Sequence, residues 1–232
     1  MLFKPSDHPE LDRRVNESIL ASSERALLDA ITVRLPDWVT PNQLTGVGLV
    51  GAAVVMLGYA LSNSDLNWLW LANFGLLIHW FGDSLDGSLA RYRVIERPRF
   101  GFYLDQVTDA IGSLMISVGV GLCPLVRMDL ALLVLAVYLM LTLQGCIRAI
   151  VDREFHIAVG RLGPTELRLG IVGMNLGIWM FGVGQVPWAD FVFSWLDLLM
   201  ILTAAGMLLL MLHQMRRHLV RLSAEDPPRH SR

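Results

Sequence analysis

The chain has 232 residues, of which 54% are hydrophobic and 17% are charged, and its mean hydropathy is +0.50. These values exclude an ordinary soluble domain and predict a polytopic membrane protein. The formal net charge of -2 excludes no class of partner, because the charges are segregated along the sequence. The first thirty residues lack an uninterrupted apolar core, so we do not expect them to form a cleavable signal peptide.

The first predicted element is an amphipathic helix near the N-terminus. Apolar residues recur there at helical spacing among charged ones, namely Leu20, Leu27, Leu28, Ile31 and Leu35. A helix of this kind lies on a membrane surface. Hydrophobic segments long enough to cross ~30 Å of hydrocarbon follow at 43–62, 66–90, 101–122, 126–150, 166–186 and 190–213. We therefore predict an all-α fold with six transmembrane helices and an N-terminal interfacial helix.

The distribution of basic residues predicts the orientation of these helices. Eighteen of the nineteen Lys and Arg residues lie before the first segment, in 91–99, in 148–168 or from 216 onward, and Arg127 alone lies on the other side. Basic residues concentrate in cytoplasmic loops. We expect an inner-membrane protein with a cytoplasmic segment at 1–38, a transmembrane domain at 39–218 and a disordered cytoplasmic tail at 219–232.

Four carboxylates stand at the cytoplasmic ends of the second and third segments. Asp83 and Asp86 are three residues apart, and Asp105 and Asp109 are four residues apart, so each pair shares a helix face. Asp83 lies eight residues inside Arg91 and Asp109 lies eight residues inside Gly101, which is about 12 Å of helix in both cases. If the helices are antiparallel neighbours, Asp86 lies beside Asp105 and Asp83 lies beside Asp109.

Four ionised carboxylates in one pocket need a positive partner. Like charges disfavour ionisation, and burial adds several kcal/mol per ion. Arg91 and Arg93 lie closer to the loop than the carboxylates do, whereas a site made only of oxygen ligands suits Mg²⁺ or Mn²⁺. We predict that one or two such ions bind to the four carboxylates, and of these alternatives we favour two ions. The small residues Gly87 and Ala90, one turn apart, leave room for a ligand or for a neighbouring helix.

The order Asp83-x-x-Asp86-Gly87-x-x-Ala90-Arg91, then Gly101-x-x-x-Asp105-x-x-x-Asp109, resembles the signature of the CDP-alcohol phosphotransferase family. The segment TPNQLT at 40–45 also resembles one common in that family, and the resemblance covers about 40–215. Nine residues separate Arg91 from Gly101, one more than in the commonest form. This difference lies in the predicted loop and leaves the helical spacings intact.

The resemblance implies transfer of a phosphate-linked group from a CDP-alcohol, most often CDP-diacylglycerol, to a second alcohol, with release of CMP. It implies that the four aspartates bind the metal and that Asp109 is also the general base. It further implies that Gly87, Ala90 and Arg91, together with Asn42 of TPNQLT, bind the CDP group. A membrane-embedded homodimer without nucleic-acid partners is the expected assembly.

The sequence indicates the residues that would bind the acceptor alcohol less specifically than it indicates the metal ligands. Arg148, Arg153, Arg161 and Arg168 lie between or within the fourth and fifth segments, where basic residues also serve cytoplasmic topology. If they converge on the aspartates, the acceptor is phosphorylated, such as glycerol 3-phosphate or an inositol phosphate. Pro164 and Glu166 suit a helix start, which is a second candidate anion site. His79 fits a core histidine better than a site contact, and Asp197 has no assigned role.

Two other classes also place carboxylates in membrane helices. Membrane prenyltransferases hold metal-bound diphosphate, but their two aspartate motifs lie far apart in the chain, whereas eighteen residues separate Asp86 from Asp105. A cation transporter needs polar residues along a continuous path across the membrane. The aspartates here are confined to the cytoplasmic third, which favours the CDP-alcohol interpretation.

Overall fold

The computed structural model describes residues 20–152, 163–182, 185–188 and 191–226. Within them the chain forms the helices α1 (Ala21–Thr32), α2 (Pro41–Leu61), α3 (Leu69–Tyr92), α4 (Pro98–Leu122), α5 (Met128–Asp152), α6 (Pro164–Phe181) and α7 (Trp195–Glu225). A 3-10 turn, η1 (Leu66–Trp68), precedes α3. Two short strands, β1 (Gln185–Trp188) and β2 (Phe191–Ser194), form an antiparallel hairpin before α7 that the sequence analysis did not predict.

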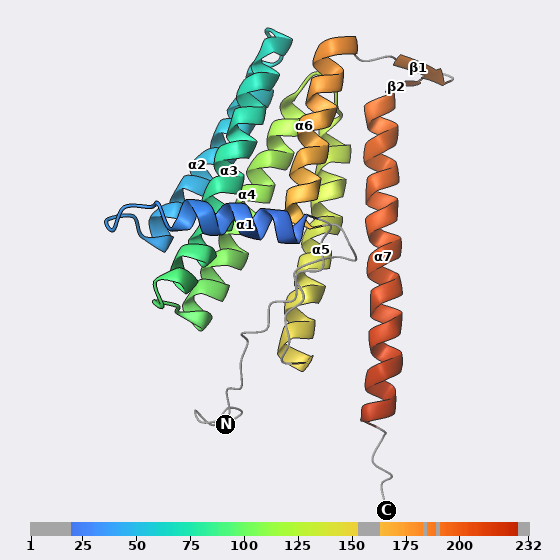
Figure 1. Ribbon diagram of the computed structural model, residues 1–232. Coiled ribbons are helices and arrows are strands. Elements are labelled where there is room, and N and C mark those ends of the chain that lie inside the picture. Colours follow the sequence, from blue (N-terminus) through green and yellow to red (C-terminus); the bar gives the residue numbers. More distant parts are fainter. Residues whose placement is uncertain (1–19, 153–162, 183–184, 189–190, 227–232) are drawn as a thin grey trace, which may run out of the picture.

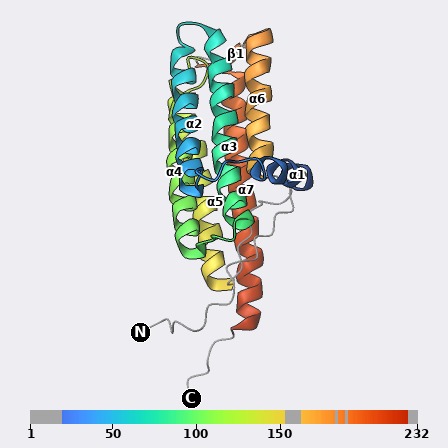
Figure 2. The same ribbon diagram turned by 60° about the vertical axis from the view of Figure 1, so that its left-hand side comes forward.

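The helical membrane fold agrees with the prediction. The long helices α2 to α7 correspond to the six predicted segments and run side by side, while α1 lies across them (Figures 1 and 2). Three of them, α2, α5 and α7, are long and apolar enough to cross a membrane by length and composition. α7 continues through residues 219–225, which we expected to be disordered. Its Arg221 pairs with Asp152 at the end of α5 at 2.5 Å.

Glycines bring α2 and α3 into backbone contact. A Cβ atom added at Gly82 of α3 would lie 2.2 Å from the Gly48 nitrogen of α2, and one added at Gly51 would lie 2.3 Å from the His79 nitrogen. A Cβ atom added at Gly58 or Gly75 would lie similarly close to the backbone of the facing helix. Helices in lipid associate mainly by such close packing, because burial of apolar side chains offers little advantage there. This contact fixes Asp83, which directly follows Gly82, relative to α2.

The TPNQLT segment starts α2. Thr40 is the N-cap: its hydroxyl accepts from the Gln43 N–H at 3.3 Å, and the Gln43 side chain accepts from the Thr40 N–H at 2.8 Å. Pro41 occupies the first helical turn, where its missing N–H costs nothing. Much of this segment therefore has a capping role.

Arg93 holds the connection between α1 and α2. Its guanidinium donates to the carbonyl oxygens of Leu35, Pro36, Asp37 and Val39, at 3.3, 2.8, 3.2 and 2.5 Å. Four backbone acceptors are thus satisfied by one side chain at the end of α3. This contact ties the surface segment to the helix that carries Asp83 and Asp86.

Asp197 caps α7. Its carboxylate accepts from the Ser194 N–H at 3.0 Å and from the Arg127 N–H at 3.3 Å, while the Ser194 hydroxyl accepts from the Asp197 N–H at 3.1 Å. This reciprocal capping explains why an almost fully buried aspartate stands there. The sequence analysis had no role for it.

A buried polar network attaches α6 to α2 and α3. Tyr59 of α2 donates to the Asn175 carbonyl oxygen at 2.9 Å, and the Asn175 amide donates to Asn73 of α3 at 2.8 Å. Asn175 has no exposed surface. By contrast, no atom of the described chain lies within 4 Å of a Cβ added at Gly173 or Gly177 of α6. Polar contacts therefore add to the apolar packing of α6 around the buried Ile178.

The glycine contact predicts a position-specific loss of stability. Gly51→Ala would push α2 away from the α3 backbone and cost about 1–3 kcal/mol, as overpacking does. Gly46→Ala on the same helix adds its methyl to open space and should leave stability unchanged or slightly higher. Thermal unfolding of both variants in detergent measures the difference. Equal melting temperatures would show that the α2–α3 backbone contact is not tight.

Candidate active site between α2, α3 and α4

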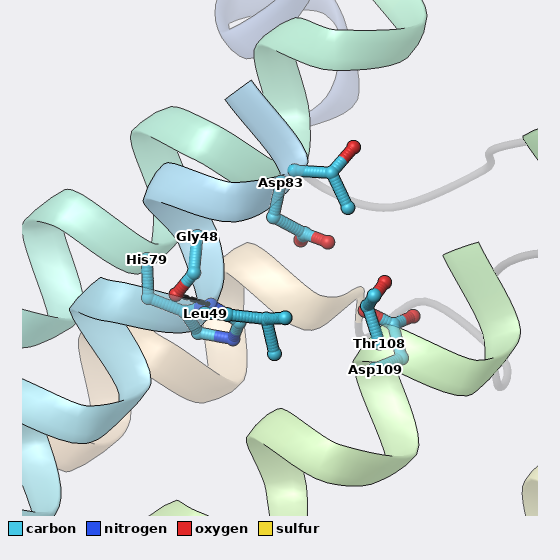
Figure 3. A pocket seen from close by; sticks show the side chains of 7 residues that line it. Gly48, Leu49, His79, Asp83, Thr108 and Asp109 are labelled. Carbon is cyan, nitrogen blue, oxygen red and sulfur yellow. Dashed lines mark hydrogen bonds between the residues drawn. The ribbon is translucent and has the colours of Figure 1, made fainter. Parts of the chain in front are cut away.

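The site lies where α3 and α4 face each other across α2. α2 packs against both of these helices, while α3 and α4 make few direct contacts in the described chain. α3 and α4 therefore face each other across a space instead of packing closely, because the α2 glycines draw α3 onto α2. The remaining space is a pocket lined by Thr45, Gly48, Leu49, His79, Asp83, Thr108 and Asp109 (Figure 3).

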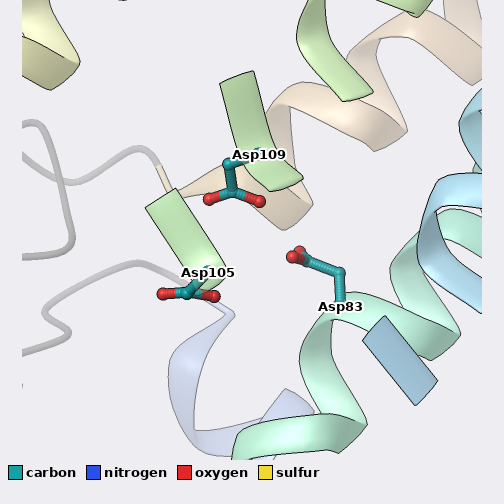
Figure 4. Close-up of side chains that lie close together, drawn as sticks. All are labelled: Asp83, Asp105 and Asp109. Atoms are coloured by element: carbon teal, nitrogen blue, oxygen red, sulfur yellow. The ribbon is translucent and has the colours of Figure 1, made fainter. Parts of the chain in front are cut away.

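Three of the four predicted aspartates meet in this space. Asp83 of α3 points toward Asp105 and Asp109 of α4 (Figure 4), and each carboxylate offers an oxygen within 4.8 Å of the others. Oxygen ligands held ~2.1 Å from Mg²⁺ lie about 3–4 Å apart in an octahedral shell. Small side-chain movements would bring this acidic cluster, Asp83, Asp105 and Asp109, to that spacing. The donor set thus fits a hard divalent cation.

Asp86 lies beside the acidic cluster but outside it. Its Oδ2 accepts from the Thr45 hydroxyl at 2.6 Å, and its Oδ1 accepts from the Gly87 N–H at 2.5 Å. Three residues turn a helix through about 300°, so Asp86 is rotated from Asp83 toward α2. It remains within electrostatic range of Asp83 and Asp105. Asp86 therefore lies beside the acidic cluster, and its hydrogen bond to Thr45 of α2 is a contact that the sequence did not predict.

Arg168 of α6 supplies positive charge to the site. Its guanidinium forms an ion pair with Asp83 that is largely shielded from solvent. His79 is buried, and its Nδ1 donates to the Gly48 carbonyl at 3.1 Å, which leaves Nε2 facing the Arg168 Nη2 at 3.5 Å. His79 is therefore both a hydrogen-bonded core histidine and a pocket residue. A cation bound by the acidic cluster would compete with Arg168 for Asp83.

The predicted CDP-binding residues lie near the N-terminal end of α2 and the C-terminal end of α3. Gly87 and Ala90 are half-buried and follow Asp86, whereas Asn42 and Arg91 are exposed. The Arg91 guanidinium donates to the Ser88 hydroxyl at 3.2 Å. No atom of the described residues lies within 4 Å of a Cβ added at Gly101, so close packing against the described helices does not explain this glycine. The space beside Gly101 is open to a ligand.

The structure separates the four candidate acceptor residues. Arg168 reaches the site, while Arg153 and Arg161 lie outside the described residues. Arg148 stands on α5, and its buried Nε has no hydrogen-bond partner within the described residues. Among these four, Arg168 alone is shown at the acidic cluster.

The start of α6 does not offer a free anion site. The Glu166 carboxylate accepts from the Gly163 N–H at 3.0 Å and from the Leu20 N–H at 2.8 Å. The Glu24 carboxylate of α1 accepts from Thr165 in the same turn. Two negative side chains therefore already neutralise the positive end of this helix.

The sequence analysis missed several pocket residues. Thr45 belongs to TPNQLT, but nothing in its type distinguished it from the capping residues beside it. Gly48, Leu49 and Thr108 look like ordinary membrane-helix residues. The i, i+3 spacing of Thr45 and Gly48 is the one available signal, since it puts both on a single face of α2.

Comparison with known proteins identifies the family. The model of the CDP-alcohol phosphatidyltransferase family matches residues 38–211, three quarters of the chain. The match contains α2 to α6, most of α7 and every residue of the pocket. The chain belongs to the CDP-alcohol phosphatidyltransferase family.

Three curated relatives are similar to parts of the chain. A phosphatidylinositol phosphate synthase of Cutibacterium acnes is 34% identical over 36% of this chain and 38% of its own length. An archaetidylinositol phosphate synthase of Pyrococcus horikoshii is 33% identical over 53% of this chain and 61% of its own length. Cholinephosphotransferase 1 of Danio rerio is 27% identical over 48% of this chain and 32% of its own length. The alignments span less than two thirds of each relative.

The acidic cluster predicts a measurable affinity for cations. Asp105→Asn removes one of three anionic ligands and should weaken Mn²⁺ binding about tenfold or more. Asp37→Asn is the matched control, because Asp37 is exposed and lies outside the cluster. Electron paramagnetic resonance titration of the purified full chain with Mn²⁺ measures both affinities. Unchanged binding in Asp105→Asn would remove Asp105 from the ligand set.

Proposed function

We propose that this protein transfers a phosphatidyl group from CDP-diacylglycerol to a phosphorylated alcohol of the inositol phosphate type and releases CMP. Family membership supports the reaction class over a prenyltransferase or a cation transporter. The names of the bacterial and archaeal relatives support an inositol phosphate acceptor over glycerol 3-phosphate. The geometric observation that carries the proposal is the guanidinium of Arg168 beside three convergent carboxylates.

The charges of the site suit two anionic substrates. The acidic cluster, with Asp86 beside it, would repel a diphosphate unless divalent cations neutralise it. Asp83, Asp105 and Asp109 would hold one ion, and Asp86 stands close enough to contribute to a second. Bound Mg²⁺ or Mn²⁺ would neutralise the diphosphate and the charge that develops on the leaving CMP. Arg168 adds a fixed positive charge suited to the phosphate of the acceptor.

The transfer itself needs a base and an exposed phosphorus atom. The acceptor hydroxyl attacks the phosphorus of the phosphatidyl group. A bond from the hydroxyl oxygen to phosphorus forms, and the bond from phosphorus to the bridging oxygen of the diphosphate breaks. The bridging oxygen leaves with CMP, and Asp109 accepts the hydroxyl proton. Asp109 suits this role because it lines the pocket opposite Asp83.

The proposal extends to the setting of the site in the membrane. We propose that α2 to α7 all cross the inner membrane with both termini in the cytoplasm, as the distribution of basic residues favours. The site would then open to the cytoplasm for the soluble acceptor and to lipid for the acyl chains. Gly173 and Gly177 of α6 have no described atom within 4 Å of an added Cβ, which is compatible with a homodimer contact there.

A panel assay tests the proposed reaction. Membranes containing the protein are incubated with labelled CDP-diacylglycerol, Mg²⁺ and, separately, inositol phosphate, glycerol 3-phosphate, inositol or choline. We expect CMP release and a new phospholipid with inositol phosphate. A different productive acceptor would correct the acceptor class. Ion flux in liposomes without CMP release would favour a transporter.

Asp109→Asn should abolish transfer while the protein remains folded in the membrane. Loss of the base alone should lower the rate of transfer by a factor of about a hundred to ten thousand. Loss of a metal ligand should lower the rate further. Asp197→Asn, at the other end of the bundle, keeps one oxygen to accept from the Ser194 N–H but loses the second acceptor, which faces the Arg127 N–H, and it should keep its activity because it lies far from the pocket. CMP release by the two variants is compared at saturating Mn²⁺. Turnover by Asp109→Asn near that of the wild type would exclude Asp109 as the base.

Arg168→Gln should act on the acceptor. A hydrogen bond to a charged group contributes about 1.5–3 kcal/mol. Its loss should therefore raise the KM for inositol phosphate about tenfold or more. The KM for CDP-diacylglycerol should change little. Arg25→Gln, an exposed position on α1, controls for the loss of one positive charge. Steady-state kinetics with each substrate varied gives both constants, and an equal rise in both would contradict an acceptor role.

A further inference from the structure

Glu24 is a charged residue of α1 whose side chain turns into the protein. Its Oε1 accepts three hydrogen bonds, from the Trp80 Nε1 at 2.8 Å, the Ser84 hydroxyl at 3.4 Å and the Thr165 hydroxyl at 2.5 Å. Trp80 and Ser84 are one turn apart on α3, and Thr165 lies in the first turn of α6. A single carboxylate oxygen on the surface helix therefore joins the two helices that carry Asp83 and Arg168.

The bonds of Glu24 flank the ion pair of the site on both helices. Ser84 directly follows Asp83, and Trp80 precedes Asp83 by three residues. Thr165 precedes Arg168 by three residues, so the two share one face of α6. Movement of Thr165 would move the guanidinium of Arg168 with it. The contact with Glu24 thus sets the separation of α3 and α6 at the level of the pocket.

Glu166 also connects α1 with α6, but here the carboxylate belongs to α6 and the donor lies at the start of α1. Its Oε1 accepts from the Leu20 N–H at the start of α1, at 2.8 Å, while its Oε2 caps the start of α6. α6 packs chiefly on α3 in the described chain. The two glutamates are therefore the polar contacts that hold the first turn of α6 against its neighbours.

We propose that Glu24 is a positioning residue, which holds the first turn of α6 so that Arg168 reaches the pocket and binds the anionic group of the acceptor. This inference rests on the proposed function and goes beyond it, because Glu24 lies outside the family signature and its hydrogen-bond partners Trp80, Ser84 and Thr165 do not line the pocket. It assigns the surface helix α1 a part in acceptor binding.

Three substitutions distinguish positioning from simple support. Glu24→Ala removes the acceptor of all three hydrogen bonds. Glu24→Gln keeps a side-chain oxygen in place of Oε1 and should restore the contacts. Asp29→Ala removes the same charge from an exposed position on the same helix. All three are made in the full chain, so the surface helix and its connection to α2 remain present.

The first measurement is hydrogen–deuterium exchange of peptides that cover residues 164–170. In Glu24→Ala we expect exchange at this end of α6 to rise several-fold, because local opening becomes easier. Glu24→Gln and Asp29→Ala should exchange like the wild type. This measurement does not depend on activity. Unchanged exchange in Glu24→Ala would overturn the proposal.

The second measurement separates the two substrates. In Glu24→Ala the KM for inositol phosphate should rise about tenfold, with kcat and the KM for CDP-diacylglycerol within about twofold of the wild type, the pattern of lost acceptor binding. Faster exchange with an unchanged acceptor KM would overturn the proposal, since Glu24 would then only support the fold. If the wild type releases no CMP, the proposed function has failed, and the exchange data alone decide whether Glu24 holds α6.

Discussion

The backbone contact between α2 and α3 is the constraint from which the site follows. Gly51, Gly58, Gly75 and Gly82 let the two helices approach until no methyl group would fit between them. His79, Asp83 and Asp86 are thereby held close to α2. The His79 ring donates to the Gly48 carbonyl, and the Thr45 hydroxyl donates to the Asp86 carboxylate. Because α3 is drawn onto α2, α4 faces it across an opening. That opening holds the carboxylates of both helices.

Charge balance is the second organising feature. Three carboxylates approach one another in a largely apolar bundle, and Arg168 compensates one of them directly. An arginine and a divalent cation make different demands on the same oxygens, because the cation needs several ligands at once while the guanidinium pairs with one carboxylate. Arg168 and a bound cation would therefore be alternative partners of the Asp83 carboxylate. This suits a reaction in which one anionic substrate arrives with metal and another without it.

The attachment of α6 differs in kind from that of α2 and α3. No described atom lies within 4 Å of a Cβ added at its glycines. Besides its apolar contacts, it forms side-chain hydrogen bonds at three levels: Thr165 with Glu24, Arg168 with Asp83, and Asn175 with Tyr59 and Asn73. Such contacts are directional, so they fix the rotation of the helix as well as its position. The helix that carries Arg168 is therefore aligned in part by a few named residues, one of which belongs to α1.

The sequence determined the helices and the chemical type of the site. Apolar segments of membrane length, the basic loops and the spacing of Asp83, Asp86, Asp105 and Asp109 are local properties, which a chain in lipid expresses as helices with defined faces. The role of Asp197, by contrast, depends on Ser194 and on Arg127 in a distant loop.

The tertiary structure decided which faces meet. Whether Asp86 pairs with Asp105 or with Thr45 depends on the rotation of α3 against α2, which the glycine contacts set. Which arginine reaches the acidic cluster depends on how α6 docks, and sequence spacing did not separate Arg168 from Arg148. Helix periodicity fixes the residues that share a face, but packing between helices fixes their partners, because those contacts join residues far apart in the chain.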